Sequence, residues 1–185
     1  MLTPEDRLEM HRLIHKTAQD GIEHGFLKCP AFPAGPFDNP YQECIGDECS
    51  IRLQVPGCVN PAIAFHTHPV KERFASQFSL EDLKNTITYN RGVSCIGYHE
   101  EGKPAVKCVN KEDLHTQDIG YTELTLGAAY IAFKGAGEKS PLPGKNVYDL
   151  PNEEFFQVLN EFNQKVDAAM ERLEYASKVC EEILT

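Results

Sequence analysis

The chain has 185 residues, a net charge of -10 at pH 7 and 41% hydrophobic residues. This length suits one domain with an appendage and is ample for a hydrophobic core. The negative charge argues against a nucleic-acid-binding surface, which needs clustered Lys and Arg. No apolar run approaches the ~20 residues of a membrane span, and the N-terminus lacks the apolar region of a signal peptide. We therefore expect a cytoplasmic protein that binds neither nucleic acid nor membrane.

The N-terminal residues predict a helix followed by a strand. Thr3-Pro4-Glu5-Asp6 combines a Thr N-cap, a Pro in the first turn and acidic side chains at the positive end of the helix dipole. The helix should run to about Gln19 and stop at Gly21. Residues 22–29 then read as a core-like strand that contains Glu23. Burying a carboxylate is costly unless it has a partner, so Glu23 is expected to be either exposed or partnered.

Three further stretches lead to the centre of the chain. Pro30–Pro40 is rich in proline and aromatic residues, which predicts a loop. Ser50–Val55 alternates polar and apolar residues strictly, which predicts a half-buried strand. Pro61–Phe65 is apolar and predicts a short strand that Pro69 terminates, because proline has no backbone donor for a ladder.

The most informative residues directly follow that strand. Residues two apart on a strand point to the same face, so His66 and His68 should present both imidazoles to one point. Ser79 is the predicted N-cap of a helix that runs to about Asn90, with Asp82 in its first turn. Two imidazoles and one carboxylate are a usual ligand set for a catalytic zinc, with a fourth position left for water. The sequence therefore predicts a Zn²⁺ site.

A plainer interpretation of the same residues exists. Ser79-x-x-Asp82 is also an ordinary capping pair, which favours a helix without any metal. A single histidine at a strand end is usually a surface residue. Two histidines at i and i+2, followed by Pro and then by a capped Asp, form a much rarer combination, so the metal site is the favoured interpretation.

The order His66-Thr67-His68-Pro69, a loop, then Ser79-x-x-Asp82 resembles the JAMM metalloproteases, also called JAB or MPN-plus domains, including archaeal or prokaryotic deubiquitinase-like members. The resemblance covers roughly the first 110 residues. It implies an α/β fold in which helices flank a mixed, curved β-sheet (the cytidine-deaminase-like MPN/JAB fold). It also implies that the two His and the Asp bind zinc and that the Ser assists the reaction. The loop over residues 69–78 is longer than is usual in the family.

The family also has a Glu on an earlier strand that holds the zinc-bound water. By resemblance this Glu opens the strand after the first helix, often as Glu-x-x-Gly, and Glu23-His24-Gly25 is a shifted version of that pattern. Glu43 matches Glu-x-x-Gly better but lies nearer to His66 in the chain, and Glu48 is a weaker third candidate. The position after the helix favours Glu23, and Glu43 stays open as the alternative.

The seven cysteines suggest two further features. If residues 92–99 and 104–109 form a hairpin, Cys95 and Cys108 lie opposite each other, either as a cross-strand disulfide or, slightly favoured, as packed thiols. A second, structural zinc is a less favoured alternative, because its four candidate ligands lack Cys-x-x-Cys spacing. Those candidates are Cys29, Cys44, Cys49 and Cys58.

The C-terminal part divides into an ambiguous stretch and a clear helix. Leu124–Phe133 is small and apolar and fits either a buried helix or a strand. From Pro151 onward apolar residues recur at spacings of four and three, which predicts a helix of roughly 50 Å with a coiled-coil seam. We therefore expect a metalloprotease domain over 1–145 and a long heptad-patterned helix over 151–185. The seam residues are Phe155, Leu159, Phe162, Val166, Ala169, Leu173, Ala176, Cys180 and Ile183.

Two uses of that seam remain open: a homodimer through the C-terminal helix, which its regularity favours, and a brace along the chain's own domain.

Together these patterns predict a zinc metallohydrolase. Zinc on His66, His68 and Asp82 would activate water, Glu23 would act as base and then acid, and Ser79 would hydrogen-bond the oxyanion. By resemblance the substrate is an isopeptide conjugate of a ubiquitin-like modifier. The alternatives are a non-catalytic MPN-type scaffold, or a zinc hydrolase that acts on small peptides or sulfur-carrier adducts.

Overall fold

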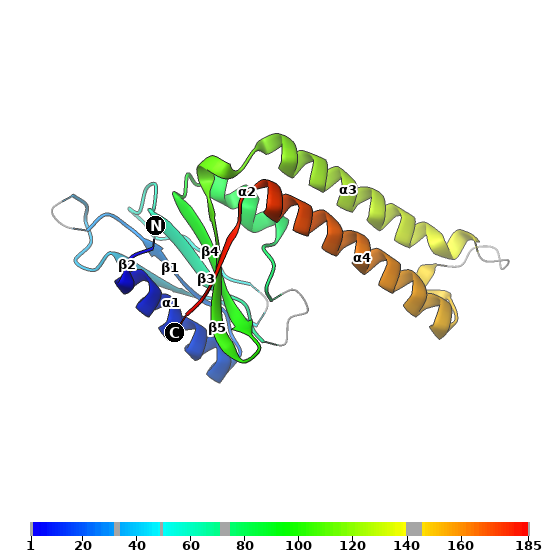
Figure 1. Cartoon of the computed structure of the whole chain (residues 1–185), viewed down its shortest axis with the longest axis horizontal. Helices are drawn as coiled ribbons and strands as arrows, with labels where there is room; N and C mark the ends of the chain where they lie inside the picture. Colours follow the sequence, from blue (N-terminus) through cyan, green and yellow to red (C-terminus); the bar gives the residue numbers. More distant parts are fainter. Residues whose placement is uncertain (1, 32–33, 49, 71–74, 140–145, 185) are drawn as a thin grey trace. The chain divides into compact units, whose positions relative to one another are not determined.

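The structure is a computed structural model that describes residues 2–31, 34–48, 50–70, 75–139 and 146–184 (Figure 1). The chain forms two compact units. The first comprises residues 1–114 together with 177–185, and the second comprises residues 115–176. The second unit begins at residue 115, whereas the sequence predicted a separate C-terminal part that begins at residue 151. The difference arises because the apolar stretch Leu124–Phe133 belongs to the second unit.

The first unit is built on a six-stranded mixed sheet with the strand order β2-β1-β3-β4-β5-β6. Neighbouring strands are antiparallel except for β3 and β4, which are parallel. The expectation of an α/β fold with a mixed sheet and flanking helices is thus confirmed. The strands are β1 (His24–Lys28), β2 (Tyr41–Ile45), β3 (Ile63–Thr67), β4 (Val93–Glu100), β5 (Lys103–Asn110) and β6 (Cys180–Ile183).

Helix α1 (Pro4–Asp20) covers one face of the sheet. It begins and ends as predicted, with a capping box between Thr3 and Asp6 and with Gly21 in the left-handed conformation at its C-cap. Its buried side chains, such as Leu13, pack with Phe65 and other residues that point to this face of the strands. This cluster is the main core of the first unit.

The opposite face carries helix α2 (Leu80–Thr88), which begins at its predicted N-cap Ser79. Thr86 Oγ1 donates to Ser94 Oγ of β4 at 2.8 Å, which fixes the helix on the sheet. Adjacent residues of a strand point to opposite faces of the sheet. The residues that alternate with those of the α1 cluster therefore form a second, smaller core on the face that carries α2. That core includes Leu27, Leu53 and Ala64.

The prediction of a strand over Ser50–Val55 is wrong. Its alternation is real, since Leu53 is buried between the exposed Arg52 and Gln54, but the segment joins no ladder. The place beside β1 is taken by β2, which follows the proline-rich loop and was not foreseen. The segment therefore lies over the sheet face and packs its apolar side chains into the smaller core.

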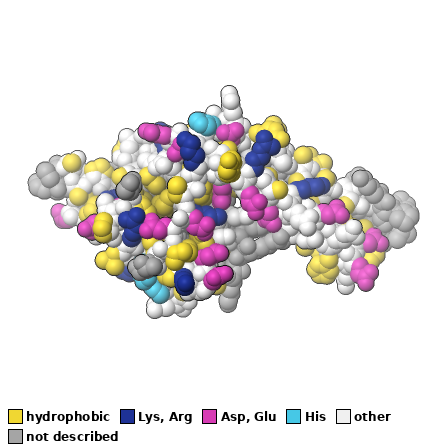
Figure 2. All heavy atoms as spheres, viewed as in Figure 1, with side chains coloured by type: hydrophobic (Ala, Val, Ile, Leu, Met, Phe, Trp, Pro, Cys, Tyr) yellow, Lys and Arg dark blue, Asp and Glu magenta, His cyan; other side chains and the backbone are white. Residues whose placement is uncertain are grey.

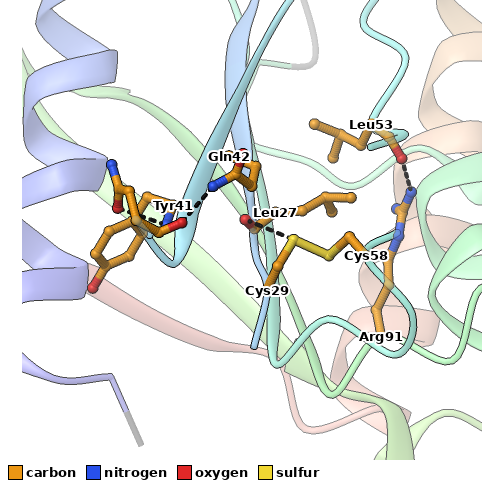
Figure 3. The surroundings of a disulfide bond; sticks show 8 residues. Leu27, Cys29, Tyr41, Gln42, Leu53, Cys58 and Arg91 are labelled. Carbon is orange, nitrogen blue, oxygen red and sulfur yellow. Dashed lines mark hydrogen bonds between the residues drawn. A yellow bond between two sulfur atoms is a disulfide. The ribbon is translucent and has the colours of Figure 1, made fainter. Parts of the chain in front are cut away.

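Two disulfides change the interpretation of the cysteines. The predicted hairpin of β4 and β5 places Cys95 opposite Cys108, and the two form a disulfide rather than the favoured pair of packed thiols. A second disulfide joins Cys29, which directly follows β1, to Cys58 (Figure 3). The alternative of a four-cysteine zinc site is therefore wrong, because these two sulfurs are bonded to each other. Cys44 is a free thiol, and Cys49 lies outside the described residues.

The second unit is a hairpin of helices α3 (Thr116–Gly135) and α4 (Asn152–Ala176). The ambiguous apolar stretch is therefore helical and buried on one side only: Ala129 and Phe133 are buried, whereas Leu124 and Ile131 are 76% and 72% exposed. Phe133 of α3 packs with Phe162 of α4 in the core of this hairpin. Short 3-10 helices η1 (Lys111–Asp113), η2 (Ala136–Lys139) and η3 (Val147–Asp149) complete the chain.

The C-terminal helix is shorter than predicted. It ends at Ala176 rather than near residue 185, the backbone turns at Lys178 with φ of 51°, and the last residues form β6 beside β5. The first residues of the heptad seam pack into the core shared with α3, so the regular spacing reflects packing within this chain. Cys180 and Ile183 belong to the strand. The homodimer through this helix stays a prediction.

No helix among the described residues is long and apolar enough to cross a membrane. On the face drawn in Figure 2, Lys and Arg side chains lie interspersed with Asp and Glu.

Candidate metal centre

The structure brings the three predicted ligands together. His66 lies in β3 and His68 directly follows it, and their Nε2 atoms are 3.0 Å apart. Asp82 comes from the first turn of α2, with Oδ1 3.5 Å from His66 Nε2. One ligand atom from each residue lies within 4.8 Å of the others, and these three form the one such group among the described residues. Both imidazoles are buried and the Asp82 side chain is 21% exposed.

The ring of His68 is held in the tautomer that a metal needs. Its Nδ1 lies 2.9 Å from the carbonyl oxygen of Ala75. Because a carbonyl only accepts, Nδ1 must carry the proton, and Nε2 of the neutral ring keeps its lone pair toward His66 and Asp82. Backbone carbonyls commonly orient metal-binding imidazoles in this way.

Asp82 is oriented by its capping partner. Its Oδ2 accepts hydrogen bonds from the backbone N–H of Ser79 at 2.9 Å and from the Ser79 hydroxyl at 2.7 Å. This leaves Oδ1 directed at His66. The capping-pair interpretation and the ligand interpretation therefore hold at once, because the two carboxylate oxygens have different partners.

The electrostatics of the group favour a neutral His66 beside an ionised Asp82. Burial lowers the pKa of His66, and the nearby Arg91 lowers it further, against the opposing attraction of Asp82. Burial would raise the pKa of Asp82, but His66 and the Ser79 hydrogen bond outweigh it and hold that pKa below its ordinary value. Metal binding requires these two protonation states.

The two donor separations that involve His66 Nε2 are compatible with a single tetrahedrally coordinated ion such as zinc. Two ligands bound tetrahedrally at about 2.05 Å from zinc lie about 3.3 Å from each other. The observed separations of 3.0 Å and 3.5 Å bracket that value. Two nitrogens and one carboxylate oxygen also leave one tetrahedral position for water or substrate.

Glu23 directly precedes β1, the strand that neighbours β3 in the sheet. Gly25 pairs with His66 at the end of the β1–β3 ladder, and continuing this antiparallel register two residues beyond the ladder would set Glu23 opposite His68. Residues directly opposite each other in a ladder share one face of the sheet. Glu23 is 5% exposed, and its backbone is held by hydrogen bonds with Gly46 and Asp47.

The close approach of β1 and β3 depends on Gly25. A Cβ at this position would lie 2.4 Å from the carbonyl oxygen of Phe65 and 3.1 Å from Cβ of His66. Only glycine fits there without moving the strand that carries the histidines.

The alternative base, Glu43, lies on the other side of the sheet. It is opposite Phe26, which belongs to the α1 face, and it forms ion pairs with Arg12 and Lys16 of that helix. The structure therefore rules Glu43 out as a neighbour of the metal ligands. Glu48 is exposed in a bend after β2.

A cleft of about 260 Å³ opens beside His66 and Asp82. One wall is the extended segment Ser50–Gln54, for which the sequence had predicted a strand. Another wall is the C-terminal part of α2 and the residues that follow it. Arg91 lies in this cleft, and no sequence pattern singled it out. The other lining residues are Ser50–Gln54, Asn85 and Tyr89.

Comparisons of the chain with protein-family models, with curated proteins and with solved structures found no match.

Proposed function

We propose that this chain is a zinc-dependent hydrolase of amide or isopeptide bonds, with the MPN/JAB type of fold. The observation that supports the proposal best is the convergence of His66, His68 and Asp82 from two different elements. A cap requires Ser79 and Asp82 alone, and neither histidine has a role in it. The sequence resemblance to JAMM metalloproteases supports the same reaction class.

The ligand set would hold the ion through the two Nε2 atoms and Oδ1 of Asp82. Zinc bound in such a site lowers the pKa of a bound water to ~7 and thereby supplies a nucleophile at neutral pH. The Ala75 carbonyl and the Ser79 backbone N–H keep the ligands oriented during the reaction, and the Ser79 hydroxyl adds a further hydrogen bond to Asp82 in the resting protein.

Glu23 is proposed as the proton carrier. It takes the proton of the attacking water and gives it to the leaving amine, so that the C–N bond breaks and an acid and an amine result. A carboxylate on the sheet face of the histidines, buried from bulk water, suits this role. Ser79 is exposed at the helix start, and its hydroxyl would donate to the oxyanion after rotating away from Asp82. The proposed substrates are conjugates of a ubiquitin-like modifier or smaller peptides.

The test compares Glu23→Gln with Glu43→Gln. Both variants lose one carboxylate from the first strands, but only Glu23 shares the sheet face of the histidines. Glu23→Gln should bind zinc as the wild type does and lose at least ~100-fold in turnover of a fluorogenic isopeptide substrate. Glu43→Gln should keep both properties. Full activity of Glu23→Gln would remove it from the mechanism, and zinc binding without hydrolysis by the wild type would support the scaffold alternative.

A further inference from the structure

Arg91 is a buried cation in the wall of the candidate metal cleft. It follows the C-terminal end of α2 and is 6% exposed. It lines the same cleft as His66 and Asp82. A ligand that fills this cleft can therefore contact both Arg91 and the candidate metal ligands.

The guanidinium is poorly satisfied by the protein. One terminal nitrogen is 3.4 Å from the carbonyl oxygen of Leu53, which is long for a hydrogen bond, and Nε is buried without a partner (Figure 3). The ring of Tyr89 lies 5.4 Å from the guanidinium carbon. Within the described part of the chain, Arg91 has no ion pair.

The surroundings hold this arginine in place. The Leu53 carbonyl belongs to the extended segment, and the Cys29–Cys58 disulfide ties the chain just after that segment to the residue that follows β1 (Figure 3). The guanidinium is buried beside this segment and the ring of Tyr89, so part of its side-chain freedom is already lost before a ligand binds.

A buried guanidinium with free N–H groups is a carboxylate receptor. Arginine donates in a planar fork that matches both oxygens of a carboxylate, and it stays charged even where burial disfavours the charge. Its one acidic neighbour in the cleft, Asp82, already shares its oxygens between Ser79 and His66. The anion that Arg91 lacks must therefore come from a ligand.

We propose that Arg91 binds the C-terminal carboxylate of a peptide whose last amide bond is the one hydrolysed. This inference rests on the proposed function and narrows its substrate class. Because Arg91 and the candidate metal ligands line one cleft of about 260 Å³, we assign the carboxylate and the scissile nitrogen to the same terminal residue, and the scissile carbonyl to the residue before it. Water adds to the acyl carbon, the C–N bond breaks, and the products are a shortened peptide acid and one free amino acid.

The first test measures binding without any reaction. N-acetyl-glycyl-glycine and its C-terminal amide are titrated separately into metal-free protein and followed by NMR. The wild type should bind the acid about ten- to a hundredfold more tightly than the amide, as expected for a charge-assisted bond. Arg91→Gln should bind the two equally, and Arg91→Lys should fall between. Arg12→Gln, which removes an exposed arginine of α1 on the other face of the sheet, should behave as the wild type.

Equal binding of acid and amide by the wild type would overturn the proposal, and so would an acid preference that survives Arg91→Gln. If Arg91→Gln does not fold, Arg91→Lys decides, because it keeps the charge and loses only the planar fork.

The second test uses zinc-loaded protein and compares hydrolysis of a peptide acid with that of the matching amide. The wild type should cleave the acid with at least ~10-fold higher kcat/KM, mainly through KM, and Arg91→Gln should lose that ratio while it keeps its zinc. Equal rates for both substrates would overturn the role of Arg91. A third outcome separates the two proposals. If the wild type binds zinc but hydrolyses neither substrate, while the first test still shows carboxylate binding that depends on Arg91, the hydrolase proposal is rejected and the carboxylate site stands.

Discussion

Asp6 is predicted to be the most important single carboxylate for the stability of the first unit. Its side chain is 1% exposed. Lys28 Nζ and the Tyr41 hydroxyl each donate to its Oδ1 at 2.6 Å, and the backbone N–H of Thr3 donates to Oδ2 at 2.8 Å. Asp6→Asn removes the charge and one acceptor, so at least one of these donors is left unpaired. Removing one partner of a buried charged pair costs roughly 3–5 kcal/mol, and the partial exposure of Lys28 reduces this to about 2–4 kcal/mol.

The loss of stability caused by Asp6→Asn should become smaller as the pH falls. Burial would raise the pKa of Asp6, but the hydrogen bonds from Lys28, Tyr41 and Thr3 outweigh it and hold that pKa below the ordinary value. A carboxyl with a depressed pKa in the folded state stabilises the protein above its unfolded pKa of about 4, and this contribution disappears as the pH falls through the folded value. The gap in unfolding free energy between wild type and Asp6→Asn should therefore be full at pH 7 and shrink below pH 4.

Urea denaturation of both proteins at pH 7 and pH 3, followed by circular dichroism, measures this gap. Glu5→Gln is the control, because it removes one acidic charge from the same helix turn at an exposed position, and it should change the midpoint little. The reasoning fails if Asp6→Asn unfolds at the wild-type urea concentration, or if its deficit is as large at pH 3 as at pH 7.

Two other substitutions test the packing and the ligand orientation of the metal centre. Gly25→Ala should destabilise the protein by about 1–3 kcal/mol and weaken zinc binding, because the added Cβ would collide with the backbone of β3. Gly127→Ala is the control: a Cβ at this position on helix α3 has nothing within 4 Å, so this variant should be more stable than the wild type by up to ~1 kcal/mol. Thermal unfolding of both variants checks this, and equal melting temperatures would count against it. Ser79→Ala should lower the zinc affinity about 10- to 100-fold, because Asp82 loses the hydrogen bond from the Ser79 hydroxyl. Competition with a chelator measures this affinity, and an unchanged value would show that Ser79 does not orient Asp82.

The parts of the structure that were predicted correctly depend on local chemistry. The caps at Thr3 and Ser79 set the starts of α1 and α2, and a two-residue period brought His66 and His68 to one face. The hairpin register that faces Cys95 with Cys108 also follows from a short turn. Each of these features is determined by residues that are close in sequence.

The errors arose where distant parts of the chain compete. Ser50–Val55 alternates like a strand, but β2 occupies the sheet position, and the alternation instead serves packing over the face. Helix α4 ends at Ala176 because the following residues gain a ladder with β5, which a heptad pattern cannot reveal. Arg91 was missed for the same reason, since its importance comes from segments that lie far away in the sequence.

The central claim is that His66, His68 and Asp82 form one metal site. The most direct test is the zinc content of the purified protein after loading and dialysis, measured by mass spectrometry of the metal, for the wild type, His68→Ala and the control His15→Ala. His15 is an exposed histidine of α1, outside the proposed ligand set. We expect about one zinc per chain in the wild type and in His15→Ala, and none in His68→Ala. Zinc that persists in folded His68→Ala, or a wild type that retains none, would contradict it.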